Sequence, residues 1–207
     1  MKCKLEIVSG FLGSGKTSFI NSYLTTEMCN NDETLVVLLE RGTTNIEKKF
    51  KNVKIVYLNN CDNMEDLLID EIKHKKYNRI IIEFNGTYDL SIIAKLLKNR
   101  KVKEQVTFYG NYFIGDSSNL EVYLKNMGEL IIPFIQSSKI IVLNNLNSIN
   151  KEKRERLMNI IEGINLTAPI ICSLSINNLK EDLNKSSYFR EGILTRGIRT
   201  LFNKEGK

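Results

Sequence analysis

The sequence contains no tryptophan, one histidine and two prolines among its 207 residues. The histidine, His74, stands in the lysine-rich stretch 73–76, so we expect it to be exposed and exclude a Ser-His-Asp triad. No run of about 18 or more apolar residues occurs, which excludes a membrane-spanning helix. The amino terminus lacks a secretion signal. We therefore expect a cytoplasmic protein with no membrane partner.

Cysteine is also scarce. The four cysteines are far apart and form no CxxC pair, so their spacing indicates neither a disulfide framework nor a zinc site. Cys3 and Cys172 fall in predicted strands, where we expect them to be buried in the core. Cys61 lies in a polar segment between a predicted strand and a predicted helix.

Positive charge exceeds negative charge only slightly. Thirty Lys and Arg residues against 24 Asp and Glu residues give a net charge of +6. That excess suits a small anionic ligand but is modest for a nucleic-acid-binding protein. Between Lys151 and Arg156 the basic residues alternate with acids, as on the solvated face of a helix. The sequence therefore predicts no nucleic-acid partner.

Short apolar runs alternate with helical patterns along the chain. This order is typical of an α/β fold with a mostly parallel sheet covered by helices on both faces. Strands are predicted at residues 5–8, 35–39, 53–58, 80–82, 106–114, 140–143 and 170–173. Helices are predicted at residues 17–26, 64–74, 90–99 and 151–161. No linker divides the chain, so one domain over residues 1–207 is expected.

Three local features give further expectations. Asn63, followed by Asp66, resembles the capped start of a helix. Pro133 is expected to break the stretch 120–135 into two pieces. The polar tail from about 184 to 207 carries isolated apolar residues and is expected to form a short docked helix.

Residues 10–17, Gly-Phe-Leu-Gly-Ser-Gly-Lys-Thr, match the phosphate-binding loop G-x-x-x-x-G-K-[ST] at every defined position. The glycines allow backbone N–H groups to face phosphate oxygens, and the following helix adds its positive end. Lys16 is expected to bridge the β- and γ-phosphates, and the Thr17 hydroxyl to bind Mg²⁺. The predicted nucleotide-binding residues of this segment are Gly10, Gly13, Ser14, Gly15, Lys16, Thr17 and Ser18. The loop alone does not distinguish an ATPase, a GTPase and a kinase.

The segment GFLGSGKT resembles the phosphate loop of CobW-type GTPases, relatives of the urease and hydrogenase accessory GTPases that help to deliver metals or cofactors. The similarity continues in order over residues 3–175. The segment 40–42 stands where that family has Glu-Phe-Gly, and 83–86 where it has Glu-Thr-x-Gly. Gly115-Asp116 is similar to the family's Val-Asp. Gln136 is similar to the Gln that precedes the next strand in the family. The resemblance implies a P-loop NTPase fold.

The resemblance also implies roles for individual residues. Glu83 would hold Mg²⁺ through a water or position the attacking water, with a solvated strand end as the alternative. The Gly86 N–H would approach the γ-phosphate, or Gly86 would only complete an Asn-Gly turn. Glu40 would begin a segment that orders when a γ-phosphate is present, with a plain surface loop as the alternative. Lys16, Glu83 and Glu40 are therefore the candidate catalytic residues.

The chain departs from the family pattern at the metal site. The family has Cys-x-Cys-Cys where this chain has the single thiol of Cys61. One thiol cannot form a tetrahedral thiolate site, although Cys61 with Asp62 could supply part of a transition-metal site completed by outside ligands. A lone thiol without metal is the alternative. The carboxy-terminal domain of the family is also not recognised in this sequence.

A second departure concerns the base of the nucleotide. Asn144-Asn145-Leu146-Asn147 replaces the family's Asn-Lys-x-Asp, in which Asp accepts hydrogen bonds from guanine. The amide of Asn147 would place a donor against a donor of guanine, which costs about 1–3 kcal/mol. Asn144 and Asn147 are therefore candidate base-binding residues, and the choice between GTP and ATP stays open.

The preferred interpretation is Mg²⁺-assisted hydrolysis of GTP or ATP by an accessory or metallochaperone-type switch. Its client would be a metalloenzyme or a cofactor-dependent enzyme, and a homodimer is left open. One alternative is a non-hydrolysing nucleotide-binding module that acts on a partner protein. Another is a small-molecule kinase with Arg190, Arg196 and Arg199 in a lid.

Overall fold

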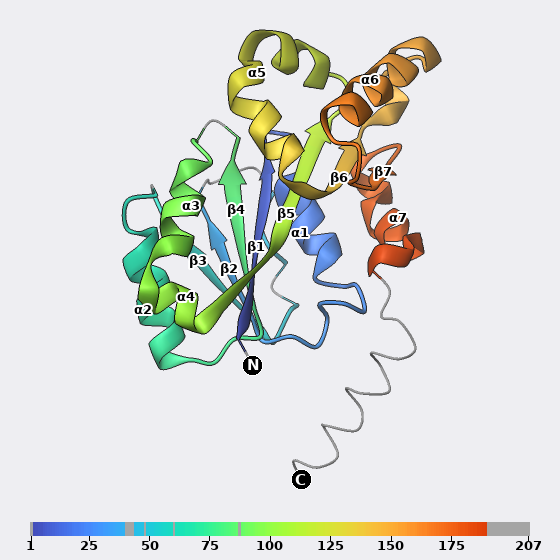
Figure 1. Cartoon of the computed structure of the whole chain (residues 1–207). Helices are drawn as coiled ribbons and strands as arrows, with labels where there is room; N and C mark the ends of the chain where they lie inside the picture. Colours follow the sequence, from blue (N-terminus) through green and yellow to red (C-terminus); the bar gives the residue numbers. More distant parts are fainter. Residues whose placement is uncertain (1, 40–43, 48, 60, 87, 190–207) are drawn as a thin grey trace.

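The computed structural model describes residues 2–39, 44–47, 49–59, 61–86 and 88–189. In this part of the chain, parallel strands form one seven-stranded sheet in the order β3-β2-β4-β1-β5-β6-β7 (Figure 1). The strands are β1 (Cys3–Gly10), β2 (Thr34–Leu38), β3 (Val53–Tyr57), β4 (Arg79–Asn85), β5 (Val106–Asp116), β6 (Ser138–Asn144) and β7 (Ile170–Cys172). Each matches a strand predicted from an apolar run, and the parallel α/β fold is confirmed.

Helices connect the strands and cover both faces of the sheet. The α-helices are α1 (Lys16–Tyr23), α2 (Met64–His74), α3 (Ser91–Lys98), α4 (Arg100–Gln105), α5 (Leu120–Gln136), α6 (Lys151–Ile164) and α7 (Leu179–Lys185). Three short 3₁₀ helices are η1 (Leu146–Ser148), η2 (Ile176–Asn178) and η3 (Ser187–Phe189). Helices α4 and α7 were not predicted, because each is too short to show a clear 3.6-residue period.

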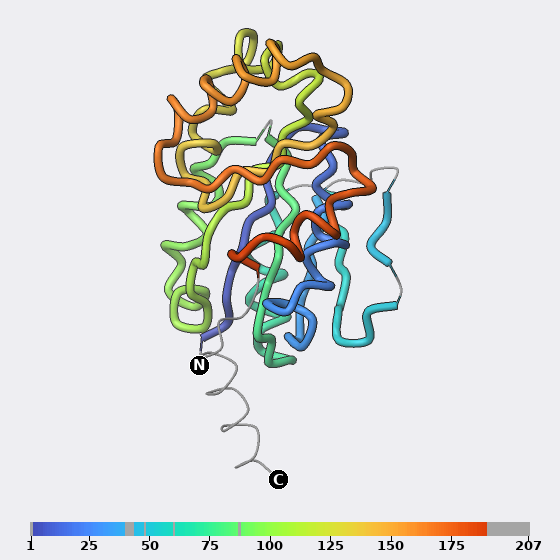
Figure 2. Tube along the Cα trace, turned by 90° about the vertical axis from the view of Figure 1, so that its right-hand side faces the viewer, coloured from blue at the N-terminus to red at the C-terminus, as the bar shows by residue number. Residues whose placement is uncertain are grey.

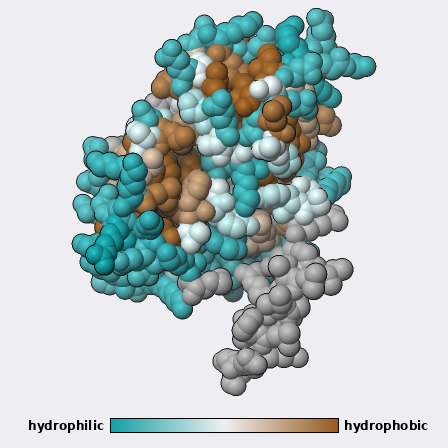
Figure 3. Space-filling view, in the orientation of Figure 1, coloured by the Kyte–Doolittle hydropathy of each residue, from teal (hydrophilic) through white to brown (hydrophobic). Residues whose placement is uncertain are grey.

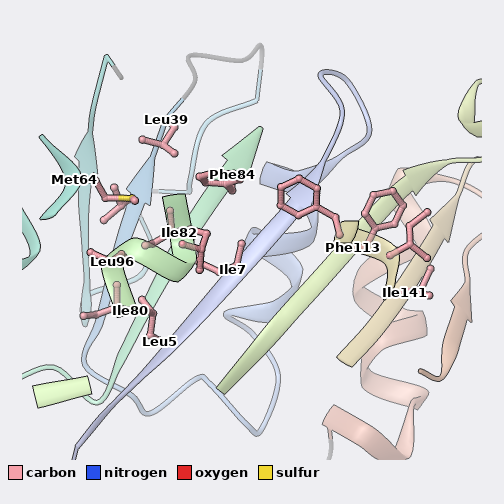
Figure 4. Close-up of a cluster of buried hydrophobic side chains, with 14 of the residues drawn as sticks. Leu5, Ile7, Leu39, Met64, Ile80, Ile82, Phe84, Leu96, Phe113 and Ile141 are labelled. Atoms are coloured by element: carbon pink, nitrogen blue, oxygen red, sulfur yellow. The ribbon is translucent and has the colours of Figure 1, made fainter. Parts of the chain in front are cut away.

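The sheet separates two hydrophobic cores. In β4, Ile80 and Ile82 pack into the core shared with α2 to α6, whereas Ile81 between them packs into the core shared with α1 and α7. Figure 4 shows part of the first core, with Ile80, Ile82 and Leu5 among the labelled side chains. Figure 2 shows α7 beside α1 on the opposite face. A strand with apolar residues at successive positions is therefore covered on both sides, as its sequence indicates.

Helix α5 differs from the prediction. The chain stays helical through Pro133, and the non-helical backbone lies at Met127 (φ −137°, ψ 29°). A proline ring meets the carbonyl group of the residue four positions earlier, here Glu129. The non-helical residue Met127 lies two residues before Glu129 and six before Pro133. The predicted break at Pro133 is therefore wrong in position.

Several smaller expectations have mixed outcomes. Cys3, in the central strand β1, is buried as predicted, but Cys172 is exposed because β7 is a short strand at the edge of the sheet. Helix α2 begins directly after Asn63, as predicted, but Asn63 makes no side-chain capping hydrogen bond. His74 is exposed as expected. Of the tail, only the end of α7 and η3 lie within the described residues.

A buried ionic cluster, absent from the sequence predictions, lies near the amino-terminal ends of the strands. Arg79 is fully buried, and its guanidinium donates to Asp32 Oδ2 from Nε at 3.0 Å and from Nη2 at 2.8 Å. Nη1 also pairs with Glu6. The hydroxyl groups of Tyr23 and Tyr112 donate to Glu6 Oε1 at 2.9 and 3.0 Å. Burial and the Glu6 charge raise the pKa of both tyrosines well above 10.

The surface carries a few exposed apolar side chains. Figure 3 shows hydrophobic areas among the helices of the face that carries α3 and α5. In α5, Val122 and Leu130 are exposed, while Leu12, Leu174 and Ile176 are exposed elsewhere. Across the described ranges, none of the helices has the length and apolar character that crossing a membrane would require.

Candidate functional site

The loop between β1 and α1 has a backbone that glycine favours. Gly10, Gly13 and Gly15 have φ values of 144°, 75° and 95°, which side chains of L-residues rarely allow. A Cβ on Gly10 would overlap the Ile114 carbonyl oxygen, and one on Gly15 would lie 2.6 Å from Asn144 Nδ2. The predicted loop therefore has the conformational freedom and the close packing that its glycine spacing indicates.

Two polar side chains of this loop are buried inside it. Lys16, only 3% exposed, donates from its ammonium group to the Phe11 carbonyl oxygen at 2.9 Å. Ser14 is also buried, and its hydroxyl has no hydrogen-bond partner among the residues that the structure describes. The N–H of Phe19 is already used by the Gly15 carbonyl oxygen at 2.8 Å. Lys16, Ser14 and the first N–H groups of α1 thus form one electropositive cradle.

Thr17 and Glu83 meet beside the cradle. The Thr17 hydroxyl donates to the Glu83 carboxylate, at 2.8 Å from Oε2 and 3.1 Å from Oε1. The side chains come from the start of α1 and the end of β4, and the residues are 9% and 4% exposed. A hydroxyl and a carboxylate supply the hard oxygen ligands that Mg²⁺ prefers. The two predicted metal-binding residues therefore lie together and suit that ion.

The loop after β4 is attached to the cradle. The Gly86 N–H donates to the Gly10 carbonyl oxygen at 3.0 Å, and a Cβ on Gly86 would lie 3.3 Å from the Gly10 carbonyl carbon. Gly86 is thus close to the phosphate loop, and its N–H is engaged there. The predicted contact with a γ-phosphate stays a prediction.

The loop after β6 is attached to the other side of the cradle. The fully buried Asn144 donates from Nδ2 to the Ser14 carbonyl oxygen. Asn145 adopts a left-handed conformation with φ 57°, which asparagine tolerates better than most residues. The N–H of Asn147 donates to the Leu174 carbonyl oxygen at 3.1 Å, and its side chain is exposed. Asn144 therefore connects the predicted base-binding loop to the predicted phosphate loop.

Other candidate residues have different positions. Glu40 lies outside the described residues, as do Arg41, Gly42, Arg190, Arg196 and Arg199. Ser18 is half-buried in the first turn of α1. Asp116, at the end of β5, accepts hydrogen bonds at Oδ1 from the N–H and hydroxyl of Ser118.

Cys61 packs against the core on one face of the sheet, whereas α1 packs on the opposite face. It is half-buried and lines a pocket of about 190 Å³ together with Asp62, Glu65 and Lys95. Burial, followed by the charge of Asp62, raises the pKa of the Cys61 thiol to about 11. Among the described residues, no group of three or more His, Cys, Asp or Glu side chains could hold a metal ion. A metal role for Cys61 would thus need ligands from elsewhere.

Sequence reasoning missed the loop after β7. Ser173 donates from its N–H to the Leu143 carbonyl oxygen at 2.8 Å, and Leu146 donates to the Ser173 carbonyl oxygen at 3.2 Å. Ile176 packs against the cradle, with Cγ1 3.6 Å from the position of a Cβ on Gly15. The general rule that ligands bind at the carboxyl ends of parallel strands was the signal that could have included this loop.

Comparison with known proteins decides the family. The sequence profile of the CobW/HypB/UreG nucleotide-binding domain matches residues 4–172. The chain belongs to this family. The match extends from Lys4 in β1 to Cys172 at the end of β7 and includes both the phosphate loop and Asn147, so the resemblance carried by the sequence motifs is confirmed.

One similar protein is the zinc-regulated GTPase metalloprotein activator 1 of Dictyostelium discoideum. It is 25% identical over 229 residues, a match that covers 88% of this chain and 48% of the relative. The chain therefore spans about half the length of this relative. The family is one of GTPases.

Solved structures show the same fold. The Zn(II)-bound YjiA GTPase from E. coli superposes with a TM-score of 0.63 at 20% identity, covering 82% of this chain and 57% of that chain. HypB from Helicobacter pylori in complex with nickel gives a TM-score of 0.52 at 12% identity, covering 99% and 88%. At these identities the similarity establishes the P-loop NTPase fold.

Proposed function

We propose that the chain binds a purine nucleoside triphosphate with Mg²⁺ in the cradle of residues 10–17 and hydrolyses its terminal phosphate. The observation that carries this proposal is the cradle itself, a glycine loop with buried Lys16 and Ser14 at the start of α1. These groups supply positive charge and hydrogen-bond donors in a place where the backbone can approach an anion closely. Membership of a GTPase family supports the same ligand class.

Lys16, Ser14 and Glu83 have different roles in the proposed reaction. Lys16 moves its ammonium group from the Phe11 carbonyl oxygen to phosphate oxygens and neutralises charge that develops there. The Ser14 hydroxyl, without a partner among the described residues, offers a further donor. Glu83 orients the attacking water or a water of the metal ion, because its carboxylate is held at the cradle by Thr17.

Thr17 and Glu83 are the residues that would hold Mg²⁺. When bound, the ion supplies positive charge that offsets the charge of the β- and γ-phosphates. The Thr17 hydroxyl is suited to direct ligation, and the nearby Glu83 carboxylate to holding the ion through water.

We further propose that hydrolysis serves a client protein that needs a metal or a cofactor. This part rests on the family and on the printed description of the Dictyostelium relative as a metalloprotein activator. A transition metal would be cargo, and Cys61 with Asp62 is the proposed place of contact, completed by ligands of the client. A cytoplasmic location fits this role.

The test compares Lys16→Ala with the wild-type chain. We expect nucleotide binding with Mg²⁺ to be lost in titration calorimetry and phosphate release to fall to background. Lys151→Ala changes an exposed lysine of α6 and should leave both unchanged. Equal binding by Lys16→Ala and wild type would overturn the site. Binding without phosphate release above the Lys16→Ala level would identify a non-hydrolysing module, and phosphate transferred to an acceptor would identify a kinase.

A further inference from the structure

Helices α2 and α4 pack side by side on the face of the sheet opposite α1, with a groove of about 470 Å³ between them (Figure 1). Helix α2 ends just before β4 begins, and α4 ends just before β5 begins. The groove therefore lies toward the amino-terminal ends of the strands, away from the phosphate cradle. The residues that line this α2–α4 groove are Ile69, Ile72, Lys73, Lys101, Glu104 and Gln105.

The floor of the α2–α4 groove is apolar. Ile69 and Ile72 are half-buried, because one side of each packs against the core. Both also line the groove, so their other side is open to it. An apolar floor of this kind can be covered by an apolar side chain of a partner.

The walls of the groove carry positive charge. Lys73, on α2, and Lys101, on α4, are exposed, and neither makes an ion pair with any residue that the structure describes. Glu104 is the acid of the groove, and its Oε1 is paired with Arg100 Nε at 2.8 Å. The two lysines are therefore available to an anionic partner.

Much of the basic character of the chain is concentrated around this groove. Of the 30 Lys and Arg residues, eight lie in segments 73–76 and 95–103, which contain no Asp or Glu, and all eight are exposed. The remaining 22 Lys and Arg residues stand against 24 Asp and Glu residues. The net positive charge of the chain thus arises from this one face, which attracts anionic partners to the groove.

The apolar floor restricts which anionic partner fits. A nucleic acid binds a basic surface through its phosphates, which gain nothing from an apolar floor. An anionic membrane takes up apolar side chains that protrude, whereas Ile69 and Ile72 are half-buried between charged walls. An acidic protein segment that also carries apolar side chains matches both the floor and the lysines.

We propose that the α2–α4 groove binds an acidic, amphipathic segment of a partner protein. Apolar side chains of the segment cover Ile69 and Ile72, and its carboxylates pair with Lys73 and Lys101. Because these ion pairs form at the surface, salt weakens the association. The groove is separate from the cradle, so this interaction is additional to the proposed function and does not depend on it.

The experiment measures fluorescence anisotropy of a labelled helical peptide with leucines on one face and glutamates on the other. We expect the wild-type chain to bind it, with an affinity that falls as salt increases. Lys73→Glu/Lys101→Glu should bind at least about tenfold less tightly. Lys151→Glu/Lys180→Glu is the matched control, since it makes the same change of charge at two exposed lysines on α6 and α7. Its affinity should stay within about twofold of the wild-type value.

A second pair of variants tests the apolar floor. Ile72→Ser should weaken binding of the peptide about fivefold or more, because it removes apolar surface that the leucines cover. Leu166→Ser makes a similar change at a residue that is 88% exposed and far along the chain, and should leave the affinity unchanged. Thermal unfolding verifies that each variant is folded at the temperature of the measurement.

The proposal is overturned if the wild-type chain does not bind the glutamate peptide, or if a peptide with glutamine in place of glutamate binds equally well. It is also overturned if the two double variants lose affinity equally, or if Ile72→Ser binds like the wild-type chain. Tighter binding of an RNA oligonucleotide or of vesicles with anionic lipid, lost in Lys73→Glu/Lys101→Glu, would assign the groove to that ligand instead. No nucleotide is present in these measurements, so their failure leaves the test of the cradle by Lys16→Ala unaffected.

Discussion

The hydroxyl of Thr17 donates to the carboxylate of Glu83, 66 residues later in the chain, with Oε2 at 2.8 Å. This hydrogen bond joins the first turn of α1 to the end of β4. It holds a carboxylate next to a phosphate-binding loop, in a place that is almost closed to solvent. The position of Glu83 is therefore fixed by contacts within the chain itself.

Replacement of Glu83 should separate binding from hydrolysis. We expect Glu83→Gln to lower the rate of phosphate release by about a hundredfold or more, since an amide cannot accept a proton from water. Nucleotide affinity should change much less, because the cradle and Lys16 remain. Single-turnover phosphate release and titration calorimetry measure the two quantities. Glu155→Gln, on an exposed face of α6, is the control. A wild-type rate in Glu83→Gln would contradict this role.

Gly15→Ala should damage both the site and the fold. The residue has φ 95°, and a Cβ would lie 2.6 Å from Asn144 Nδ2. We expect nucleotide affinity to fall at least about tenfold and the free energy of unfolding to fall by about 1–3 kcal/mol. Chemical unfolding and calorimetry measure these effects.

Gly163→Ala provides the comparison. A Cβ at this helical position meets nothing within 4 Å, so the change should raise stability by up to about 1 kcal/mol and leave affinity unchanged. Equal behaviour of the two alanine variants would show that the conformation of Gly15 does not matter.

Arg79→Met should strongly destabilise the fold. It leaves Glu6 and Asp32 buried without their cation, for an expected loss of about 3–5 kcal/mol in the free energy of unfolding. Lys75→Met breaks the exposed pair with Glu33 and should cost under about 1 kcal/mol. Urea unfolding at neutral pH tests the pair of variants, and similar losses for both would refute the importance of burial.

Alkaline pH should unfold the chain through groups that must stay neutral inside it. Burial raises the pKa of the Cys29 thiol from 9.0 to about 12. The unfolded chain therefore loses this proton at lower pH than the folded chain, so stability is fully present below about pH 9 and decreases as pH rises toward 12. Each such group contributes a slope of up to about 1.4 kcal/mol per pH unit.

Cys29→Ala tests this assignment. The variant should lose less stability than the wild-type chain between pH 9 and pH 12, because one of the buried protons is gone. Between pH 7 and pH 8 the two curves of unfolding free energy against pH should run parallel. An identical alkaline slope for both proteins would assign the effect to other groups, such as Tyr23.

The sequence predicted those parts of the molecule that depend on local pattern. The phosphate loop was recognisable because its chemistry requires glycine and lysine at defined spacing. The strands were recognisable because buried parallel strands need continuous apolar residues, as in β4. Cys172 was misplaced because the apolar run of β7 does not show that the strand lies at an edge.

Features that depend on contacts between distant segments were not predictable in this way. Arg79 stands beside an apolar run, and nothing in that run indicates its partners. Its ion pairs with Glu6 and Asp32 join segments that are distant in the sequence. The contact of Asn144 with Ser14 depends on the packing of β6 beside the cradle. In α5 the non-helical backbone lies at Met127, a position that Pro133 does not indicate.

The ionic cluster and the cradle lie at opposite ends of the same strands. Arg79 pairs in register with Lys4, and Asn85 with Gly10, so six residues of strand, or about 20 Å, separate the two ends. Inherited substitutions near Arg79 would consequently alter how much folded protein a cell holds, while the cradle of each folded molecule would keep its geometry. Abundance and the shape of the site in this chain can thus change independently.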